Sequence, residues 1–231
     1  TGTVQPIERV AHIARASGAL VHSDAAQALG KIAIDVEALG VDLMTLVGHK
    51  AYAPKGIGAL YVRAGVAIAP LLLRGGQEGA LRPGTENVPS IVGLGAACAL
   101  TTERLEHEAA RQRRLKEALF EGLAGRVPGL GRNGCEGGGR AHESLPNTLS
   151  VRFPGVLGSA VLAAAPRVAA STGSACHEGG EVASAVLVAM GLPENDALGT
   201  VRLSLGRGTT EADVERAVGA LADAWARVRT G

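Results

Sequence analysis

Two ionisable residues, Asp24 and Lys50, stand where short apolar runs of the sequence end, at 19–24 and 41–50, and a glycine-bearing third run follows at 56–62. Runs of this kind, separated by short helical segments, predict neighbouring strands of a mostly parallel sheet covered on both faces. Ligands bind just beyond the carboxyl ends of such strands. A carboxylate and an amine at that edge suit pyridoxal 5'-phosphate (PLP), which needs a lysine for its Schiff base and an acid for its pyridine nitrogen.

Each of these two residues has an ordinary structural alternative. A free lysine is protonated near neutral pH and cannot attack a carbonyl group, but burial beside a phosphate-bearing cofactor can make one nucleophilic. The alternative is that Lys50 is a surface lysine in a turn. Asp24 would hold the pyridine nitrogen protonated, so that the ring accepts electrons released at the substrate's Cα. Its alternative is to cap a helix beginning at Ala25, and the two roles do not easily coexist.

Cys176 is the third candidate, because it lies in a stretch of small residues, STGSACHEGG at 171–180. A thiol on a flexible loop with a histidine beside it can become a thiolate, approach a cofactor and leave again. The alternative is an incidental loop cysteine. Cys98 lies in an alanine-rich segment typical of packing, and Cys135 has nothing comparable nearby. Three cysteines without CxxC spacing predict neither a disulfide framework nor a zinc site, and no metal is expected.

Composition narrows the class of protein. The chain has 231 residues, of which 46% are hydrophobic and 19% charged, so it is predicted to be globular. A net charge of +1 gives no basic surface for nucleic acid. No apolar run approaches the roughly 20 residues of a membrane helix, and the first residues lack the pattern of a secretory signal. We therefore expect a soluble cytoplasmic protein that binds neither nucleic acid nor membrane.

Ordered blocks of the sequence resemble the cysteine desulfurases and selenocysteine lyases, the class V group of PLP enzymes. HSDAAQ at 22–27 and GHKAYAPKGIGALYVR at 48–63 resemble the cofactor-binding core of that family. Further blocks with the same likeness lie at 75–95, 145–153, 171–180 and 201–214. Because the blocks spread over nearly the whole chain, the likeness is far more specific than a lone GHK would be.

The resemblance implies a role for each residue of the first two blocks. Lys50 would form the Schiff base and act as general base, and Asp24 would contact the pyridine nitrogen. Gln27 would reach the ring's phenolic oxygen and His49 the phosphate, against the alternatives of a surface glutamine and a hydrogen-bonded loop histidine. Many desulfurases carry a phosphate-binding serine three residues before the lysine. This chain has Val47 there, so one phosphate hydrogen bond must be absent or replaced.

Later blocks imply contacts to a second subunit and to the substrate. Thr85 resembles the threonine that crosses a dimer interface to the other subunit's phosphate, which implies a homodimer; its alternative is a helix N-cap ahead of Val88. Cys176 would take the substrate's sulfur as a persulfide. Arg202 resembles the clamp for the substrate carboxylate, a bidentate role that lysine cannot copy. The alternative is a surface strand arginine, with Arg207 as the nearest competitor.

The implied fold is the type I PLP-dependent transferase fold, an α/β fold, present only in part. Residues 1–106 are expected to be the C-terminal part of the large PLP-binding domain, and 107–231 the small C-terminal α+β domain with the cysteine loop. The boundary is placed where a long helix changes from apolar to charged. Since the family's Asn-Asn-Glu would precede Thr1, the chain is expected to lack an N-terminal part that supplies a ring-stacking histidine and further phosphate donors.

Apolar spacing and cap signals predict the elements that hold these residues. Helices are predicted at 6–17, 36–39, 89–123, 158–164, 181–190 and 211–228. Strands are predicted at 19–23, in the apolar run that ends at 47, and at 57–63, 149–153, 167–170 and 200–205. A loop is predicted at 74–89. Gly18 suits a left-handed helix end. Asp35 and Gly40 are signals for the start and stop of the second helix. Thr210 followed by Asp213 predicts the start of the last.

The resemblance implies a cysteine desulfurase, which converts L-cysteine to L-alanine and carries the sulfur on Cys176. A sulfur-acceptor or scaffold protein would take the sulfur for iron–sulfur clusters or thiolated products. Selenocysteine lyase is the first alternative, because residues 47–50, 82–87 and 175–177 also resemble lyase motifs, and selenide could leave without a cysteine carrier. The second alternative is an inactive truncated protein that only dimerises or acts as a scaffold.

Overall fold

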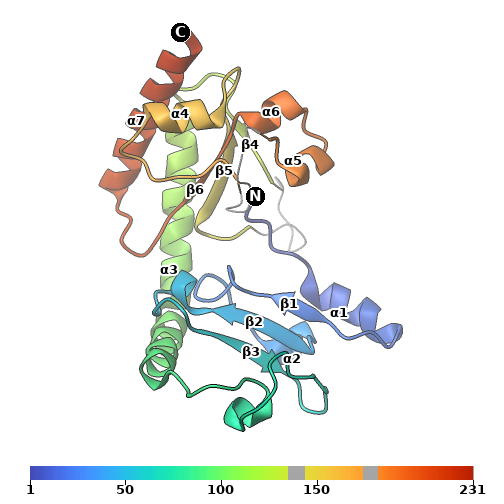
Figure 1. Cartoon of the computed structure of the whole chain (residues 1–231). Coiled ribbons are helices and arrows are strands. Elements are labelled where there is room, and N and C mark those ends of the chain that lie inside the picture. Colours follow the sequence, from blue (N-terminus) through green and yellow to red (C-terminus); the bar gives the residue numbers. More distant parts are fainter. Residues whose placement is uncertain (135–143, 174–181, 231) are drawn as a thin grey trace. The chain divides into compact units, whose positions relative to one another are not determined.

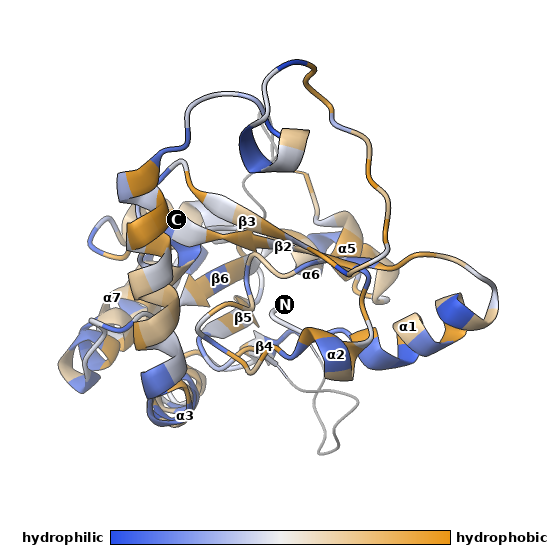
Figure 2. Ribbon diagram, turned by 90° about the horizontal axis from the view of Figure 1, so that it is seen from below, coloured by the Kyte–Doolittle hydropathy of each residue, from blue (hydrophilic) through white to orange (hydrophobic). Residues whose placement is uncertain are grey.

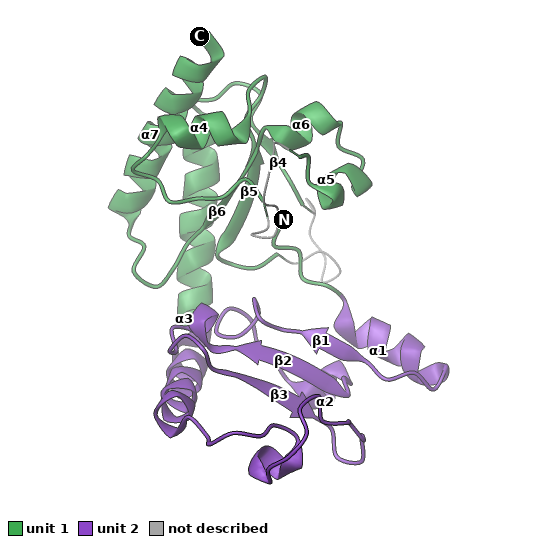
Figure 3. Ribbon diagram, in the orientation of Figure 1, with its two compact units in different colours: residues 1–5, 106–231 green, residues 6–105 purple. Residues whose placement is uncertain are grey.

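The computed structural model describes residues 1–134, 144–173 and 182–230 (Figure 1). They form two compact units (Figure 3): unit 1 contains Thr1–Gln5 and Glu106–Gly231, and unit 2 contains Pro6–Leu105. The division falls inside helix α3 (Val88–Ala124). That these units are the small and large domains of the PLP fold stays a prediction. None of the described helices combines the length and the apolar character needed to cross a membrane.

The short helices of unit 2 form where local signals predicted them. Helix α1 (Ile7–Ala16) is amphipathic, with polar and apolar residues alternating around it (Figure 2), and it buries Ala11. Gly18, at φ +69°, ends the helix and donates its N–H to the carbonyl of Arg15 at 3.0 Å. The predicted left-handed helix end is therefore confirmed.

Helix α2 (Val36–Leu39) lies in the crossover connection between the first two strands. The Asp35 carboxylate accepts the N–H groups of Glu37 at 2.9 Å and Ala38 at 3.1 Å. Gly40 ends the helix at φ +67°. Both predicted cap residues are confirmed, and the crossover lets the flanking strands run parallel.

The sheet of unit 2 has the order β1-β2-β3 (Figure 1), with β1 at His22–Asp24, β2 at Leu43–Val47 and β3 at Gly58–Val62. β1 and β2 pair in parallel, as predicted, whereas β3 pairs antiparallel to β2. The segment between β2 and β3 is too short for a crossover helix, so the chain turns back beside β2. The expected cover on both faces is also incomplete, because Leu60 of β3 is 51% exposed among the described residues.

The long helix α3 confirms the prediction of a helix from Pro89 towards Leu123. Asn87 precedes it, and its side-chain oxygen accepts the N–H of Ser90 at 3.3 Å, as an N-cap does. In unit 1 the helix contributes buried leucines to the core, at Leu115, Leu119 and Leu123. Within the predicted 74–89 loop lies one 3-10 turn, η2 (Gln77–Ala80).

Unit 1 has a second sheet of three strands in the order β4-β5-β6, antiparallel throughout. Its elements are β4 (Gly131–Arg132), β5 (Thr148–Arg152), α4 (Gly158–Ala164), α5 (Ala185–Ala189), α6 (Glu194–Leu198), β6 (Thr200–Ser204) and α7 (Glu211–Thr230). The strands and helices enclose a core that includes Phe153, Leu221 and Trp225. Unit 1 therefore combines α-helices with an antiparallel sheet, and β4 and α6 are additional to the predicted elements.

Two local details of unit 1 test the predicted elements. The expected strand at 167–170 is wrong, because the N–H of Val168 donates to the Ala165 carbonyl in a turn that closes α4.

Thr210 and Asp213 do start the last helix. The Thr210 N–H donates to Asp213 Oδ2 at 2.9 Å and the Asp213 N–H donates to Thr210 Oγ1 at 3.2 Å, which confirms the predicted capping box.

Residues Thr1–Gln5 belong to unit 1, although residues 1–106 were expected to form one domain. The carbonyl of Gly2 accepts the N–H of Leu145 at 2.7 Å. Thr3 pairs with Ser144 in an isolated antiparallel bridge. These long-range backbone pairs have no local sequence signal, so the sequence could not predict them.

Candidate functional site

Asp24 is the last residue of β1 and lies opposite Thr45 of β2. The N–H of Ala25 extends the ladder by donating to the Thr45 carbonyl at 2.9 Å. Asp24 Oδ1 accepts the N–H of Ala26 at 2.8 Å, and turns follow where a helix from Ala25 was the alternative. The segment is therefore not a regular helix, but Asp24 does use one carboxylate oxygen locally, as that alternative expected. Among the described residues Oδ2 has no partner, so the local turn leaves one carboxylate oxygen for a ligand.

Lys50 lies in the 3-10 turn η1 (Gly48–Ala51), which begins directly after β2. The N–H of Gly48 donates to the Ile57 carbonyl at 3.0 Å. A Cβ at position 48 would lie only 2.9 Å from that carbonyl oxygen, so the turn requires glycine. Tyr52 ends the turn at φ +65°. The close return of the chain at Ile57 therefore holds Lys50 at the end of β2.

The parallel pairing brings these two turns to the same edge of the sheet, beyond the carboxyl ends of β1 and β2. Gln27 lies in the turns that follow Asp24, and His49 immediately precedes Lys50. All four side chains are exposed. Unit 2 thus gathers a carboxylate, an amide, an imidazole and an amine at one edge.

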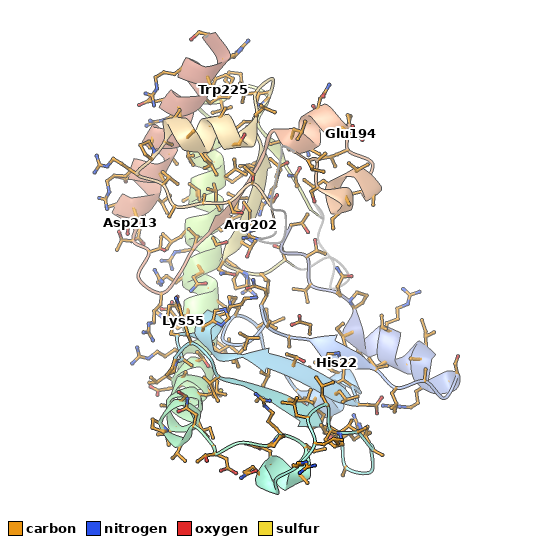
Figure 4. All side chains as sticks on the ribbon, in the orientation of Figure 1. His22, Lys55, Glu194, Arg202, Asp213 and Trp225 are labelled. Atoms are coloured by element: carbon orange, nitrogen blue, oxygen red, sulfur yellow. The ribbon has the colours of Figure 1, made fainter. Side chains whose placement is uncertain are left out.

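Two further residues at this edge were missed by sequence reasoning. His22, labelled in Figure 4, lies in β1, and its Nε2 is 2.9 Å from Thr45 Oγ1. Lys31 Nζ donates to the carbonyl oxygen of Lys50 at 3.1 Å. Burial of Lys31, and then the charge of Lys50, lower the pKa of the Lys31 ammonium. The GK pair at 30–31 lies two residues beyond the end of the HSDAAQ block, and this proximity was the only signal in the sequence.

Thr85 is exposed and lies two residues before the capping residue Asn87 of α3. The alternative role of Thr85 as the N-cap is therefore wrong, because Asn87 has that role. A phosphate contact from Thr85 across a dimer interface stays a prediction.

Arg202 lies in β6 of unit 1 and is partly buried (Figure 4). It pairs with Ser150 of β5 on one side and with Ser171 on the other. The Arg202 N–H donates to the Ser171 carbonyl at 2.6 Å, and the Ser171 N–H donates back at 3.3 Å. Ser171 is the first residue of the block 171–180 that contains Cys176. Arg202, which is predicted to bind the substrate carboxylate, therefore lies next to the start of that block.

The cysteines are described only in part. Cys176 and Cys135 lie outside the described residues. Cys98 lies in α3, is partly buried and is a free thiol. Within the described part of the chain, no group of three His, Cys, Asp or Glu side chains could hold a metal ion.

The residues at the edge of unit 2 fit PLP in their chemistry. Asp24 Oδ2 is an acceptor without a partner in the described structure, as a protonated ring nitrogen requires. Lys50 is accessible for a covalent bond, and Gln27 and His49 can donate hydrogen bonds to oxygen. The side chain of Val47, at the end of β2, cannot donate a hydrogen bond to a phosphate, so binding of the phosphate would depend on the other donors.

Comparison with known proteins agrees with this arrangement. The family model described as aminotransferase class-V matches residues 1–217. A cysteine desulfurase from Trichormus azollae is 43% identical over 231 residues, which are 99% of this chain and 56% of the relative. The chain thus spans about half the length of the curated relatives it matches.

Solved structures show the same similarity. A NifS-like protein from Rickettsia africae superposes with a TM-score of 0.85 at 31% identity, covering 97% of this chain and 59% of that one. SspA in complex with cysteine superposes with a TM-score of 0.66 at 36% identity, covering 88% and 55%. The fold is therefore the type I PLP fold, with part of its large domain present. With residues 1–217 matched by one family model, the chain belongs to the class-V aminotransferase family of PLP-dependent enzymes.

Proposed function

We propose that the protein acts as a PLP-dependent cysteine desulfurase, which takes sulfur from L-cysteine, releases L-alanine and leaves a persulfide on Cys176. The observation that carries the proposal is the meeting of the Asp24 and Lys50 turns at one edge of the parallel strand pair. Similarity to a cysteine desulfurase and to SspA in complex with cysteine supports cysteine as the substrate. These relatives do not favour selenocysteine lyase.

The edge residues would hold the cofactor through distinct contacts. Lys50 would bind it covalently, Asp24 Oδ2 would pair with the ring nitrogen, and Gln27 would contact the ring oxygen. His49 would contact the phosphate, with Thr85 from a second subunit as a further donor. When bound, PLP supplies a ring that withdraws electrons from the substrate's Cα.

The chain's own residues then move a proton and the sulfur. Lys50 Nζ would take the Cα proton of the substrate as general base. The Arg202 guanidinium would hold the substrate carboxylate. The Cys176 thiolate attacks the substrate's sulfur; the S–S bond forms as the Cβ–S bond breaks, and Cβ gains a proton. Cysteine plus an enzyme thiol thus gives alanine plus an enzyme persulfide, without an external oxidant or reductant.

The proposal also covers the partners of the protein and the cellular compartment in which it acts. A homodimer would complete each site through Thr85, and an acceptor or scaffold protein would take the sulfur from Cys176 for iron–sulfur clusters or thiolated products. The reaction would take place in the cytoplasm.

Alanine formation from L-cysteine in the presence of PLP tests this function. We expect Lys50→Ala to lower the rate by a factor of about 10²–10⁴, the usual contribution of a general base, while Lys55→Ala keeps it. Cys176→Ala should abolish persulfide formation, and Cys98→Ala should not. Intact cysteine turnover in Cys176→Ala would overturn the persulfide step.

Two further outcomes separate the alternatives. Turnover of selenocysteine that greatly exceeds turnover of cysteine, and that survives Cys176→Ala, would point to a lyase. A purified protein that shows no visible absorbance with PLP and forms no alanine would point to the inactive scaffold.

A further inference from the structure

The carbonyl oxygen of Lys50 has no backbone donor available in the next turn. The N–H of Ala53 donates to the Gly48 carbonyl at 3.1 Å, and the next residue, Pro54, has no N–H. A carbonyl left over at a helix end needs a side chain or water as its partner. Here the partner is the ammonium of Lys31, whose Nζ lies 3.1 Å from the oxygen.

Lys31 starts from a backbone that is itself fixed. Its N–H donates to the Ala28 carbonyl at 3.0 Å within the turns that follow Asp24. Gly30, at φ +71°, approaches Thr101 so closely that a Cβ at position 30 would lie 2.8 Å from the threonine methyl carbon. The Lys31 side chain therefore links an anchored turn that begins at Asp24 to the separate turn of Lys50.

The surroundings of Lys31 are unfavourable for a charge. The side chain is partly buried, and among the described residues no carboxylate pairs with it. Partial removal of an ammonium from water without an acidic partner costs some free energy, which an apolar side chain of similar length would avoid. The hydrogen bond to Lys50 is the compensating contact that the described structure gives it.

We propose that Lys31 is a positioning residue, which holds the Lys50 turn against the Asp24 turn so that amine and acid meet the same cofactor. This inference rests on the proposed function for its purpose. The link is a contact between two residues of this chain, however, so it can be measured separately from cofactor binding.

Three variants of the full chain test the link. Lys31→Met removes the ammonium and keeps the stem, Lys31→Arg keeps a cationic donor, and Lys55→Met changes an exposed lysine that follows the same turn. Amide hydrogen exchange of residues 48–53 is measured without cofactor, and PLP affinity is measured by absorbance titration.

Loss of one hydrogen bond to a charged group predicts, for Lys31→Met, exchange about tenfold faster and PLP binding about tenfold weaker. Lys31→Arg should stay within about threefold of the unmodified chain and Lys55→Met should match it. Exchange in the strand around Met44 serves as the internal reference for folding and should not change in either Lys31 variant.

Unchanged exchange and unchanged PLP affinity in Lys31→Met would overturn the inference. Equal acceleration at Met44 would overturn it too, because the effect would then be general destabilisation. If Lys31→Met does not fold, Lys31→Arg decides: exchange like that of the unmodified chain supports the link, and tenfold faster exchange overturns it. An unmodified chain that binds no PLP would count against the proposed function alone.

Discussion

The two carboxylate oxygens of Asp24 have different surroundings, and a pair of substitutions can separate them. Oδ1 accepts the N–H of Ala26, while Oδ2 has no partner in the described structure. Asp24→Asn keeps an oxygen for the turn and removes the charge. We expect it to leave stability nearly unchanged and to weaken PLP binding about tenfold to a hundredfold, the range for a hydrogen bond to a charged group. Urea unfolding and absorbance titration measure the two effects.

Asp24→Ala should also lose the turn, with a further cost of about 1 kcal/mol in the free energy of unfolding. Asp35→Asn is the matched control, because Asp35 also accepts backbone N–H groups through one oxygen but caps α2. PLP affinity equal in Asp24→Asn and Asp35→Asn would contradict the role of Asp24 as the acid for the ring.

A second residue-scale prediction concerns pH and the pair Glu117–Arg132. The guanidinium lies 2.6 and 2.8 Å from the two carboxylate oxygens. These hydrogen bonds, ahead of the charges of Arg132 and Lys116, lower the pKa of Glu117. Because the folded-state pKa of Glu117 is depressed, the stabilisation is present above the unfolded pKa of about 4.3 and is lost as pH falls through the folded pKa.

We expect Glu117→Gln to lower the free energy of unfolding at pH 7 by at most about 1 kcal/mol, since the Glu117 side chain is 46% exposed and screened by water. The difference from the unmodified chain should shrink as pH falls below about 4.3. Urea unfolding at pH 7 and at acidic pH measures this difference in the free energy of unfolding. Glu121→Gln, at an exposed glutamate of the same helix, is the control. A difference that does not depend on pH would contradict the assignment.

At the scale of elements, the turn that follows β2 depends on the absence of a side chain at Gly48. A Cβ there would meet the Ile57 carbonyl oxygen at 2.9 Å and the Ala53 Cβ at 3.1 Å. Gly48→Ala should therefore cost about 1–3 kcal/mol, the range for overpacking, and should weaken PLP binding because the backbone that presents Lys50 must shift. Thermal unfolding and PLP titration check both.

Gly95→Ala is the matched control for that substitution. Gly95 lies in α3 of the same unit, and a Cβ there would meet nothing within 4 Å. Alanine is the better helix former, so stability should rise by up to about 1 kcal/mol and PLP affinity should stay constant. Equal loss of stability in both variants would contradict a special requirement at Gly48.

The elements with signals close by in the sequence were predictable. Asp35 and Gly40 bracket a short helix, and Thr210 with Asp213 opens a long one, because caps act over two to four residues. The parallel strand pair followed from two apolar runs joined by a helical crossover, which placed Asp24 and Lys50 at one edge.

Features that depend on remote partners were not predictable. The two-residue strand Gly131–Arg132 exists only because β5 pairs with it, and the direction of β3 is set by its pairing with β2. Lys31 reaches Lys50 across 19 residues of sequence. Such contacts arise from the folded backbone, and no local pattern of residue types encodes them.

At the scale of the whole molecule, the two units bury different kinds of core. In unit 1 the buried cluster includes large residues such as Phe153, Leu221 and Trp225. In unit 2 the buried members are smaller on average: Ala11, Val21, Ala25, Val41 and Met44. Because stabilisation by burial scales with apolar area, local opening should cost less free energy in unit 2 than in unit 1.

Helix α3 allows this difference to be measured within one element, because the division between the units falls inside it. Its early part leaves Val88 59% and Val92 65% exposed, whereas Leu119 and Leu123 of its later part are buried. In the 231-residue chain without cofactor, we expect amides of 112–123 to exchange at least about tenfold more slowly than those of 92–104, after correction for intrinsic rates. Hydrogen exchange with mass spectrometry measures this. A uniform rate along the helix would mean that both units open in one cooperative step, since the weaker core would then gain its protection from the stronger one.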